Sequence, residues 1–203
     1  MTHPDRTAHI TVTRSLSREQ QARRERLIAA ARALADAGGY PAVTMHDVAD
    51  RAGVARATVY RYFATKDHLL TEVAAVWAQE IAPGDPAPGA TPEERLTGLL
   101  ERIVVVAAEN LTLASAVVQA ATSGDPGVDA ARTELFAQLR ARLSAAIGDP
   151  VPGREDAEIV LGHVLLAALV SLTSLRRPVD EVTALVRTSG RLVLRGALAA
   201  VPG

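Results

Sequence analysis

A short stretch of the chain concentrates side chains that can bind a nucleic acid. Arg56 can donate two parallel hydrogen bonds to the O6 and N7 atoms of guanine, which discriminates against a wrong base by about 1–3 kcal/mol. The same guanidinium can equally bind a phosphate, since phosphates receive most hydrogen bonds in protein–DNA complexes. Thr58 can pack its methyl group on thymine or bond a phosphate. Lys66 adds a compact cation, and it is the only lysine in the chain.

Two short helices would present these side chains. The apolar pattern from Met45 to Ala52 predicts one helix that ends at Gly53, and a second helix is expected from about residue 54 to 63. Two short helices joined by a tight glycine turn are typical of the DNA-reading helix-turn-helix. The core of this unit is expected to contain Val48, Ala49, Val54, Val59 and Phe63, which leaves Arg56, Ala57, Thr58, Tyr60 and Tyr62 to point outward.

The ends of these helices carry local signals. Thr44 is a favourable N-cap for the first short helix and would aim its N-terminus at a phosphate. The second short helix begins at Ala55, which offers no capping oxygen, and this costs about 1 kcal/mol relative to Ser or Thr. A longer helix before them starts with a capping box formed by Ser17 and Gln20. Its end is expected at Gly38-Gly39, where Gly38 suits a left-handed C-cap.

Basic residues gather in the same third of the chain. Residues 1–66 hold 11 Lys and Arg against 6 Asp and Glu, whereas residues 67–203 hold 11 against 17. A basic segment on an acidic body is typical of a nucleic-acid-binding domain. Residues 1–16 show no helical period, so we expect a flexible arm whose Arg6 and Arg14 either reach DNA or make no contact.

The remainder of the chain has the pattern of helices separated by loops rich in Pro and Gly. Only 3 % of the residues are aromatic, and a core of Ala, Leu and Val suits helices better than sheets. No window shows the period-2 alternation of a strand between turn signals. We therefore predict an all-α fold of about nine helices, with an arm at 1–16, a helix-turn-helix domain at 17–66 and a larger helical body at 67–203.

The sequence shows no pattern for catalysis, metal binding or secretion. It has no cysteine, no glycine-rich phosphate loop and no Gly-x-Ser-x-Gly, and its five histidines lack the spacing of metal ligands. We therefore expect no enzyme activity, no catalytic or metal site and no cofactor. Missing cysteines and a polar N-terminus are typical of a cytoplasmic protein. The 17 uncharged residues 159–175 reach only the lower limit for a membrane span, and we expect a helix buried inside protein instead.

The stretch from Gly39 to Leu70 resembles the TetR-type bacterial transcriptional regulators. From Thr44 to Leu69 it matches the pattern T-x-x-x-[VI]-A-x-x-A-G-V-x-x-x-T-[VL]-Y-x-[YH]-F-x-x-K-x-x-L. The strong match covers about residues 20–75, and the body agrees only in length and helical content. The residues to which the resemblance assigns DNA contacts are Tyr60, Tyr62 and Lys66 on phosphates, and His46 at a position that reaches DNA in some members.

The resemblance implies a ligand-responsive regulator of transcription. Such a protein is a homodimer whose two heads enter successive major grooves of a pseudo-palindromic double-stranded DNA operator, with half-sites roughly 34–36 Å apart. Residues 67–203 would then bind a ligand and dimerise. We expect a repressor released by a small hydrophobic or amphipathic effector, because the body is apolar with few charges. An activator of the same family, and a helical lipid-binding or scaffold protein without DNA binding, are the alternatives.

Two sets of residues in the body are candidates for these roles. The residue pattern GGY…YRYF…HLL is similar to that of regulators of steroid and lipid catabolism in high-GC bacteria. The helix over about 155–175 is apolar nearly all round, so it needs cover on two sides, as it would have in a four-helix dimer bundle with the last helix. The candidate pocket residues are Trp77, Asn110, Gln119, Phe136 and His163, and the candidate interface residues are Leu165, Leu169, Leu172, Val182, Leu185, Val186, Val193 and Ala197.

Overall fold

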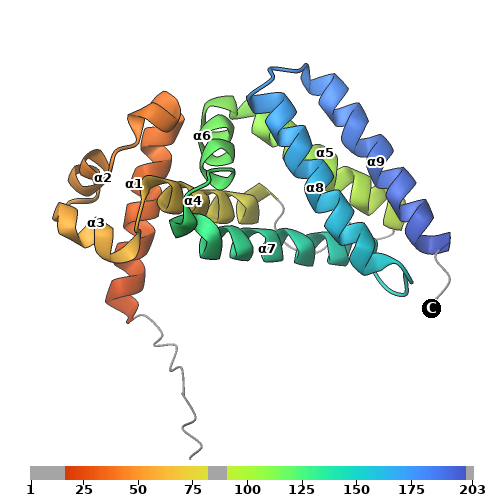
Figure 1. The fold of residues 1–203 in the computed structure, drawn as a ribbon, viewed down its shortest axis with the longest axis horizontal. Coiled ribbons are helices and arrows are strands. Elements are labelled where there is room, and N and C mark those ends of the chain that lie inside the picture. Colours follow the sequence, from red (N-terminus) through yellow and green to blue (C-terminus); the bar gives the residue numbers. More distant parts are fainter. Residues whose placement is uncertain (1–16, 82–90, 200–203) are drawn as a thin grey trace, which may run out of the picture.

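The computed structural model describes residues 17–81 and 91–199 as an all-helical protein (Figure 1). Within these residues it contains nine α-helices, one short 3₁₀ helix and no strand, which confirms the predicted fold class. The expected arm at 1–16 lies outside the described residues. The helices are α1 (Arg18–Ala42), α2 (Met45–Ala52), α3 (Arg56–Tyr62), α4 (Lys66–Ile81), α5 (Pro92–Glu109), α6 (Leu111–Ala121), η1 (Pro126–Val128), α7 (Asp129–Ile147), α8 (Arg154–Thr173) and α9 (Val179–Ala199).

Helix α1 begins as predicted and ends differently. The Gln20 amide donates to Ser17 Oγ at 3.2 Å, and the Ser17 amide donates to Gln20 Oε1 at 2.8 Å. At the other end, Gly39 rather than Gly38 has the positive φ, at 69°. A Cβ on Gly38 would lie only 2.6 Å from the Ala42 Cβ, so the close approach of the chain after the kink at Gly39 requires a glycine at position 38.

The helix-turn-helix forms where the sequence predicts it. Thr44 Oγ1 accepts the Asp47 amide at 3.1 Å and caps α2. Gly53 ends α2 in the left-handed region, with φ 66° and ψ 40°. Ala55 precedes α3 and makes no side-chain cap, as expected. The fully buried side chains that hold the unit together are Val48, Val59 and Phe63.

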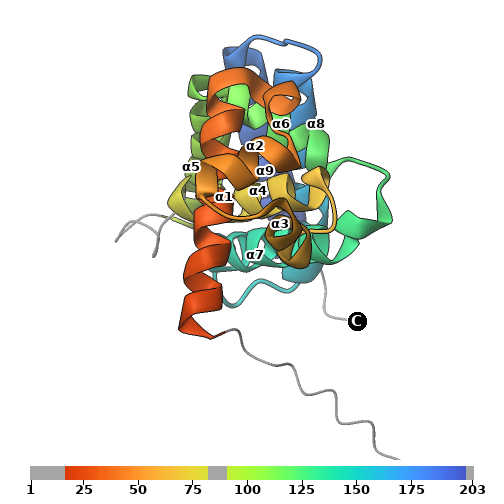
Figure 2. The same ribbon diagram turned by 90° about the vertical axis from the view of Figure 1, so that its left-hand side faces the viewer.

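The helix-turn-helix domain at 17–66, called the head below, and the body at 67–203 share one apolar core. Figures 1 and 2 show α2 and α3 beside α1, at the end of the molecule opposite α8 and α9, and α2 contacts both α1 and α3. Helix α4 follows the head and contacts α1, α6 and α7. Buried side chains form one continuous cluster from Leu27 in α1 to Ala197 in α9. A displacement in the body can therefore reach the head through packed side chains.

Helices α5, α8 and α9 form the opposite end of the protein. Arg187 of α9 pairs with Glu101 of α5, with Nε–Oε1 at 2.5 Å and Nη2–Oε2 at 2.9 Å. Gly190 lets α9 approach closely, since a Cβ there would lie 3.1 Å from the Leu100 Cδ1. Helix α8 is long and apolar enough to cross a membrane, as is the bent pair α5–α6. However, α8 contacts α5, α6, α7 and α9, so one side of it packs inside the protein.

The turn between α2 and α3 gives a first test. We expect Gly53→Ala to lower the free energy of unfolding by about 1 kcal/mol, because a left-handed backbone is strained for an L side chain. The melting temperature, followed by circular dichroism, should fall by about 2–4 °C.

A second glycine provides the matched control for that test. Gly98 lies in the exposed interior of α5, and a Cβ there would meet no atom within 4 Å. Gly98→Ala should therefore raise the stability by about 0.5–1 kcal/mol. A Gly53→Ala protein that melts at or above the wild-type temperature would contradict the expected strain.

Candidate DNA-binding surface and ligand cavity

Helix α3 presents Arg56 and Tyr60 to solvent at the outer face of the head. Both side chains are exposed, Tyr60 to 46 %. Arg56 Nη2 donates to the Tyr60 hydroxyl at 3.3 Å, and its guanidinium carbon lies 5.6 Å from the centre of the Tyr60 ring. Ala57 is also exposed and Thr58 is half-buried. The face of α3 that carries these residues is therefore open to a partner.

Tyr62 does not point outward as predicted. Its side chain is half-buried, and its hydroxyl is buried without a hydrogen-bond partner among the described residues. The reason is helical geometry, because Tyr62 follows the fully buried Val59 by three residues and so projects from nearly the same face. Its ring lies beside Phe63, with 6.3 Å between centroids. Tyr62 therefore belongs to the underside of α3.

The N-terminus of α2 lies beside this surface. Thr44 is exposed, and its hydroxyl donates to Asp47 Oδ2 at 2.6 Å while accepting the Asp47 amide. His46 is exposed, with Nε2 3.4 Å from the Asp50 carboxylate. The structure thus leaves Thr44 and His46 accessible, and their contacts with DNA stay predictions.

Lys66 ties the start of α4 to the end of α1. Its Nζ donates to the Tyr40 carbonyl at 3.2 Å and lies 3.7 Å from the centre of the Tyr40 ring. The Tyr40 hydroxyl donates to Asp67 Oδ1 at 2.6 Å. Burial lowers the pKa of Lys66, and burial together with Asp67 raises the pKa of Tyr40 to about 12. The amine therefore has a structural contact beside its predicted role as a phosphate anchor.

A second junction, which sequence reasoning missed, fixes the corner between α3 and α4. Arg24 of α1 pairs with Glu72 of α4 at 2.6 Å and lies over the Phe63 ring. His68 Nδ1 accepts the Ala64 amide at 3.3 Å. Bonds from His68 and Arg24 hold the pKa of Glu72 below its usual value despite burial. No sequence motif indicates this network, because its members come from separate helices.

The loop before η1 reaches the same corner from the body. Gly127 lies against Thr65 and Ala64, since a Cβ there would be 3.6 Å and 3.7 Å from their side chains. The Gly127 amide donates to Asp125 Oδ1 at 2.8 Å. Hydrogen bonds from Gly127 and then Thr65 lower the pKa of Asp125. Because this loop joins α6 to α7, it links those helices directly to the end of the reading unit.

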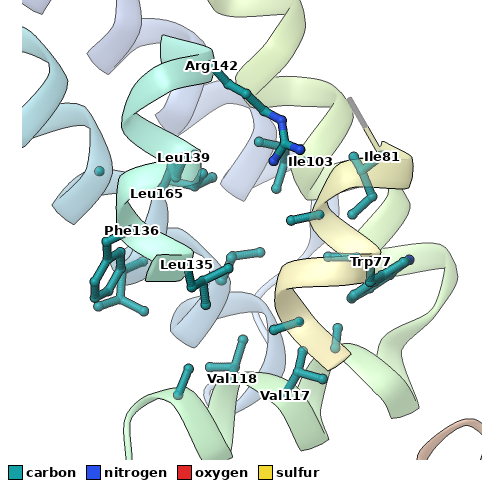
Figure 3. A pocket seen from close by; sticks show the side chains of 18 residues that line it. Trp77, Ile81, Ile103, Val117, Val118, Leu135, Phe136, Leu139, Arg142 and Leu165 are labelled. Atoms are coloured by element: carbon teal, nitrogen blue, oxygen red, sulfur yellow. The ribbon is translucent and has the colours of Figure 1, made fainter. Parts of the chain in front are cut away.

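An apolar cavity lies in the body between helices α4 to α8 (Figure 3). Its volume is about 870 Å³, including its opening to solvent. The space inside it that a water-sized molecule can reach is about 120 Å³, which is smaller than the roughly 300–1,000 Å³ usual for small-molecule sites. Trp77 and Ile81 of α4 form one wall, and Leu135, Phe136 and Leu139 of α7 lie across from them.

The cavity contains only part of the predicted pocket set. Trp77 and Phe136 line it, whereas Asn110, Gln119 and His163 do not. Asn110 lies at the α5–α6 junction, where its Nδ2 donates to the Val106 carbonyl at 2.9 Å. Gln119 is exposed on α6, and His163 is exposed on α8, where it lines a depression that adjoins the cavity. Polar residue type was a poor guide, because the wall is almost wholly apolar.

The predicted interface set is also largely internal. Five of its residues are buried inside the single chain and one more, Leu169, lines the cavity, as Leu165 does. Val193 is half-buried, and only Leu185 is exposed, at 49 %. Both C-terminal helices are apolar on two sides. The sequence period cannot show which side packs inside the protomer and which side is left for a second copy. The five buried residues are Leu165, Leu172, Val182, Val186 and Ala197.

Comparisons with known proteins agree with this geometry. Residues 27–73 match the family model of bacterial regulatory proteins of the tetR family, and residues 89–193 match the tetracyclin repressor-like C-terminal domain. The chain belongs to the TetR family. It is similar to the KstR transcriptional repressor of Rhodococcus jostii, with 34 % identity over 182 residues that cover 88 % of this chain and 85 % of that one.

Other TetR-family relatives extend the likeness to structure. The KstR repressor of Mycobacterium tuberculosis is 29 % identical over 88 % of this chain and 83 % of its own length. The crystal structure of a TetR regulator from Rhodococcus sp. RHA1 superimposes with a TM-score of 0.79, 26 % identity and coverage of 88 % and 98 %. The protein is thus a DNA-binding transcriptional regulator of the TetR family.

Substitutions at Arg56 and Lys66 separate base reading from phosphate binding. We expect Arg56→Ala to weaken binding to the specific operator about 5–150-fold and to change binding to scrambled DNA much less. Lys66→Ala should weaken binding to both DNAs and reduce the salt slope by about 1. Gel shifts at matched salt measure both effects.

The exposed Arg102 on α5 is far along the chain from the head and serves as the control. Arg102→Ala should leave both affinities unchanged. Equal losses on operator and scrambled DNA for Arg56→Ala would show that Arg56 contacts phosphate rather than a base.

Proposed function

We propose that this chain is a repressor that binds a pseudo-palindromic operator as a homodimer and releases it when a small apolar or amphipathic effector enters the body. One observation carries the proposal. The helix-turn-helix exposes Arg56 and Tyr60, and the helix that follows it, α4, lines an apolar cavity. In this scheme residues 17–66 read DNA, residues 67–203 bind the effector and dimerise, and the protein works in the cytoplasm.

The alternatives receive less support. Family membership disfavours a lipid-binding or scaffold protein without DNA binding. An activator differs from a repressor in where its operator lies relative to the promoter, and the similar KstR proteins are named repressors. Repression is therefore the better-supported direction.

Two solved structures with the same fold contain small molecules. The FadR regulator of Bacillus subtilis was crystallised with stearoyl-CoA, and the multidrug binding protein EbrR with imidazole. These proteins are only 18 % and 23 % identical to this chain, so they support the shared fold alone. The choice of an effector of the lipid or steroid kind follows instead from the apolar wall here and from the sequence resemblance described above.

Helix α4 is the proposed route from effector to DNA. Its C-terminal half lines the cavity through Ala74, Trp77 and Ile81, and its N-terminal end carries the contacts of Lys66 and Glu72 with α1. A ligand that pushes α4 away from α7 would therefore turn the head. Both heads must fit successive grooves at once, so a small rotation suffices to weaken binding.

The dimer surface is proposed on the exposed faces of α8 and α9. Only 39 % of the most apolar window of α8 is buried within the protomer, and Ile159 and Val160 are 47 % and 46 % exposed. On α9, Leu185 and Leu192 lie two turns apart and are 49 % and 65 % exposed. A second copy that covers both faces would complete a four-helix bundle.

Footprinting on the DNA upstream of the chain's own gene tests the regulatory role. A protected segment with two-fold symmetry and half-sites about 34–36 Å apart is expected. Its affinity should fall steeply with salt, because phosphate contacts release counterions. A protein that binds lipids and shows no salt-dependent affinity for this or any DNA would support the scaffold alternative.

Charges on α9 test the dimer surface. A variant with both Leu185→Glu and Leu192→Glu should sediment as a monomer at micromolar concentration, because two carboxylates would be buried without partners. Its affinity for the full operator should be lost with the dimer.

Leu198 offers the matched control on the same helix. It is 53 % exposed but lies six residues from Leu192, on the side where Arg187 and Arg195 pair with α5. Leu198→Glu should remain a dimer. A wild-type protein that sediments only as a monomer would contradict the proposed arrangement.

A further inference from the structure

One charged side chain lines the apolar cavity. Arg142 extends from α7, and Figure 3 shows its guanidinium near Ile103 and Ile81, at the end opposite Val117 and Val118 of α6. Among the described residues that line the cavity, all others are uncharged. The cavity therefore has an apolar body and a single cationic end.

Arg142 has no partner within the described part of the chain. No hydrogen bond or ion pair joins it to another described residue, whereas the other two arginines of α7 each have a partner. Arg132 Nε donates to the Ala121 carbonyl at 2.8 Å, and Arg140 Nε lies 3.7 Å from Glu158 Oε2. Arg142 is half-buried, and loss of water lowers its pKa from the usual value. A guanidinium in such a place is unfavourable unless an anion joins it.

The chemistry of this group selects a class of ligand. A guanidinium is planar and has five donors, which match the oxygens of a carboxylate or phosphate in pairs. A neutral sterol or alkane would leave it unpaired, and a cationic drug would be repelled.

We propose that the effector is an anionic amphiphile, whose apolar body fills the space between α4, α6 and α7 and whose carboxylate or phosphate binds Arg142. This inference rests on the proposed ligand-responsive function and specifies the chemistry of its effector. The competing explanation is that the arginine stem covers apolar surface while its head stays in water at the cavity mouth. In that case an anion gains nothing.

Three probes that share a twelve-carbon alkyl chain separate these explanations. Dodecanoate and dodecyl phosphate carry the anion in its two forms, and dodecan-1-ol replaces it with a neutral hydroxyl. Trp77 is the only tryptophan in the protein and lines the cavity, so its fluorescence reports binding without a label. The full-length protein is titrated without DNA. At least one anion should bind about 10–100-fold more tightly than the alcohol, the range for one charged hydrogen-bonded contact.

Substitutions assign that preference to Arg142. Arg142→Gln should weaken binding of the preferred anion by about the same 10–100-fold and leave the alcohol unchanged. Arg142→Lys should keep part of the preference, because the charge remains while the planar fork is lost. Arg102→Gln, on the exposed side of α5, removes a charge away from the cavity and should behave as wild type.

Thermal melting without ligand shows whether Arg142 is only structural. Because the group is desolvated and unpaired, Arg142→Gln should melt at or above the wild-type temperature. A lower melting temperature with an unchanged preference for the anion would overturn the inference.

The outcomes also separate this inference from the proposed function. Equal binding of anions and alcohol to the wild type, or binding of none of the probes, overturns the anionic effector while operator binding, measured independently by gel shift, still stands. Absence of operator binding removes the proposed regulator, whichever probe the cavity prefers.

Discussion

The packing of α4 against α1 at one of its ends and around the cavity at the other is the constraint on which the rest depends. Its first turns are held to α1 by Lys66 on Tyr40 and by Glu72 on Arg24, and its last turns form the cavity wall with Trp77 and Ile81. A helix is stiff, and a close-packed core resists gradual deformation. In the proposed mechanism, a ligand that displaces the wall formed by α4 would therefore move the head as a rigid unit.

The head could be predicted almost fully from the sequence, because its signals are local. Ser17, Thr44 and Gly53 each act on the backbone within four residues, so their roles as caps and turn do not depend on distant packing. The outward orientation predicted for Tyr62 was wrong, because that orientation depends on which face of α3 is buried with Val59. The sequence located the Gly38-Gly39 break correctly but assigned the positive φ to Gly38 instead of Gly39.

The body could be predicted only in outline. Its helices follow from apolar period and loop composition, but the faces of α8 and α9 that meet within one protomer depend on tertiary packing. Five of the predicted interface residues became protomer core for this reason. Asn110 and Gln119 were chosen for their polarity, whereas the cavity is marked by apolar surface and by Arg142, which no motif distinguishes from the other arginines.

The exposed leucines of α9 also have a consequence for the concentration at which the protein can work. A lone protomer keeps Leu185 and Leu192 in water, so the proposed association would contribute to the stability of the fold itself. In the proposed dimer, mass action then couples folding to abundance. Dilution separates the subunits, exposes both apolar faces and leaves each head with a single half-site. The proposed dimer would therefore have a threshold concentration, below which both the stability of its fold and its affinity for the full operator fall together.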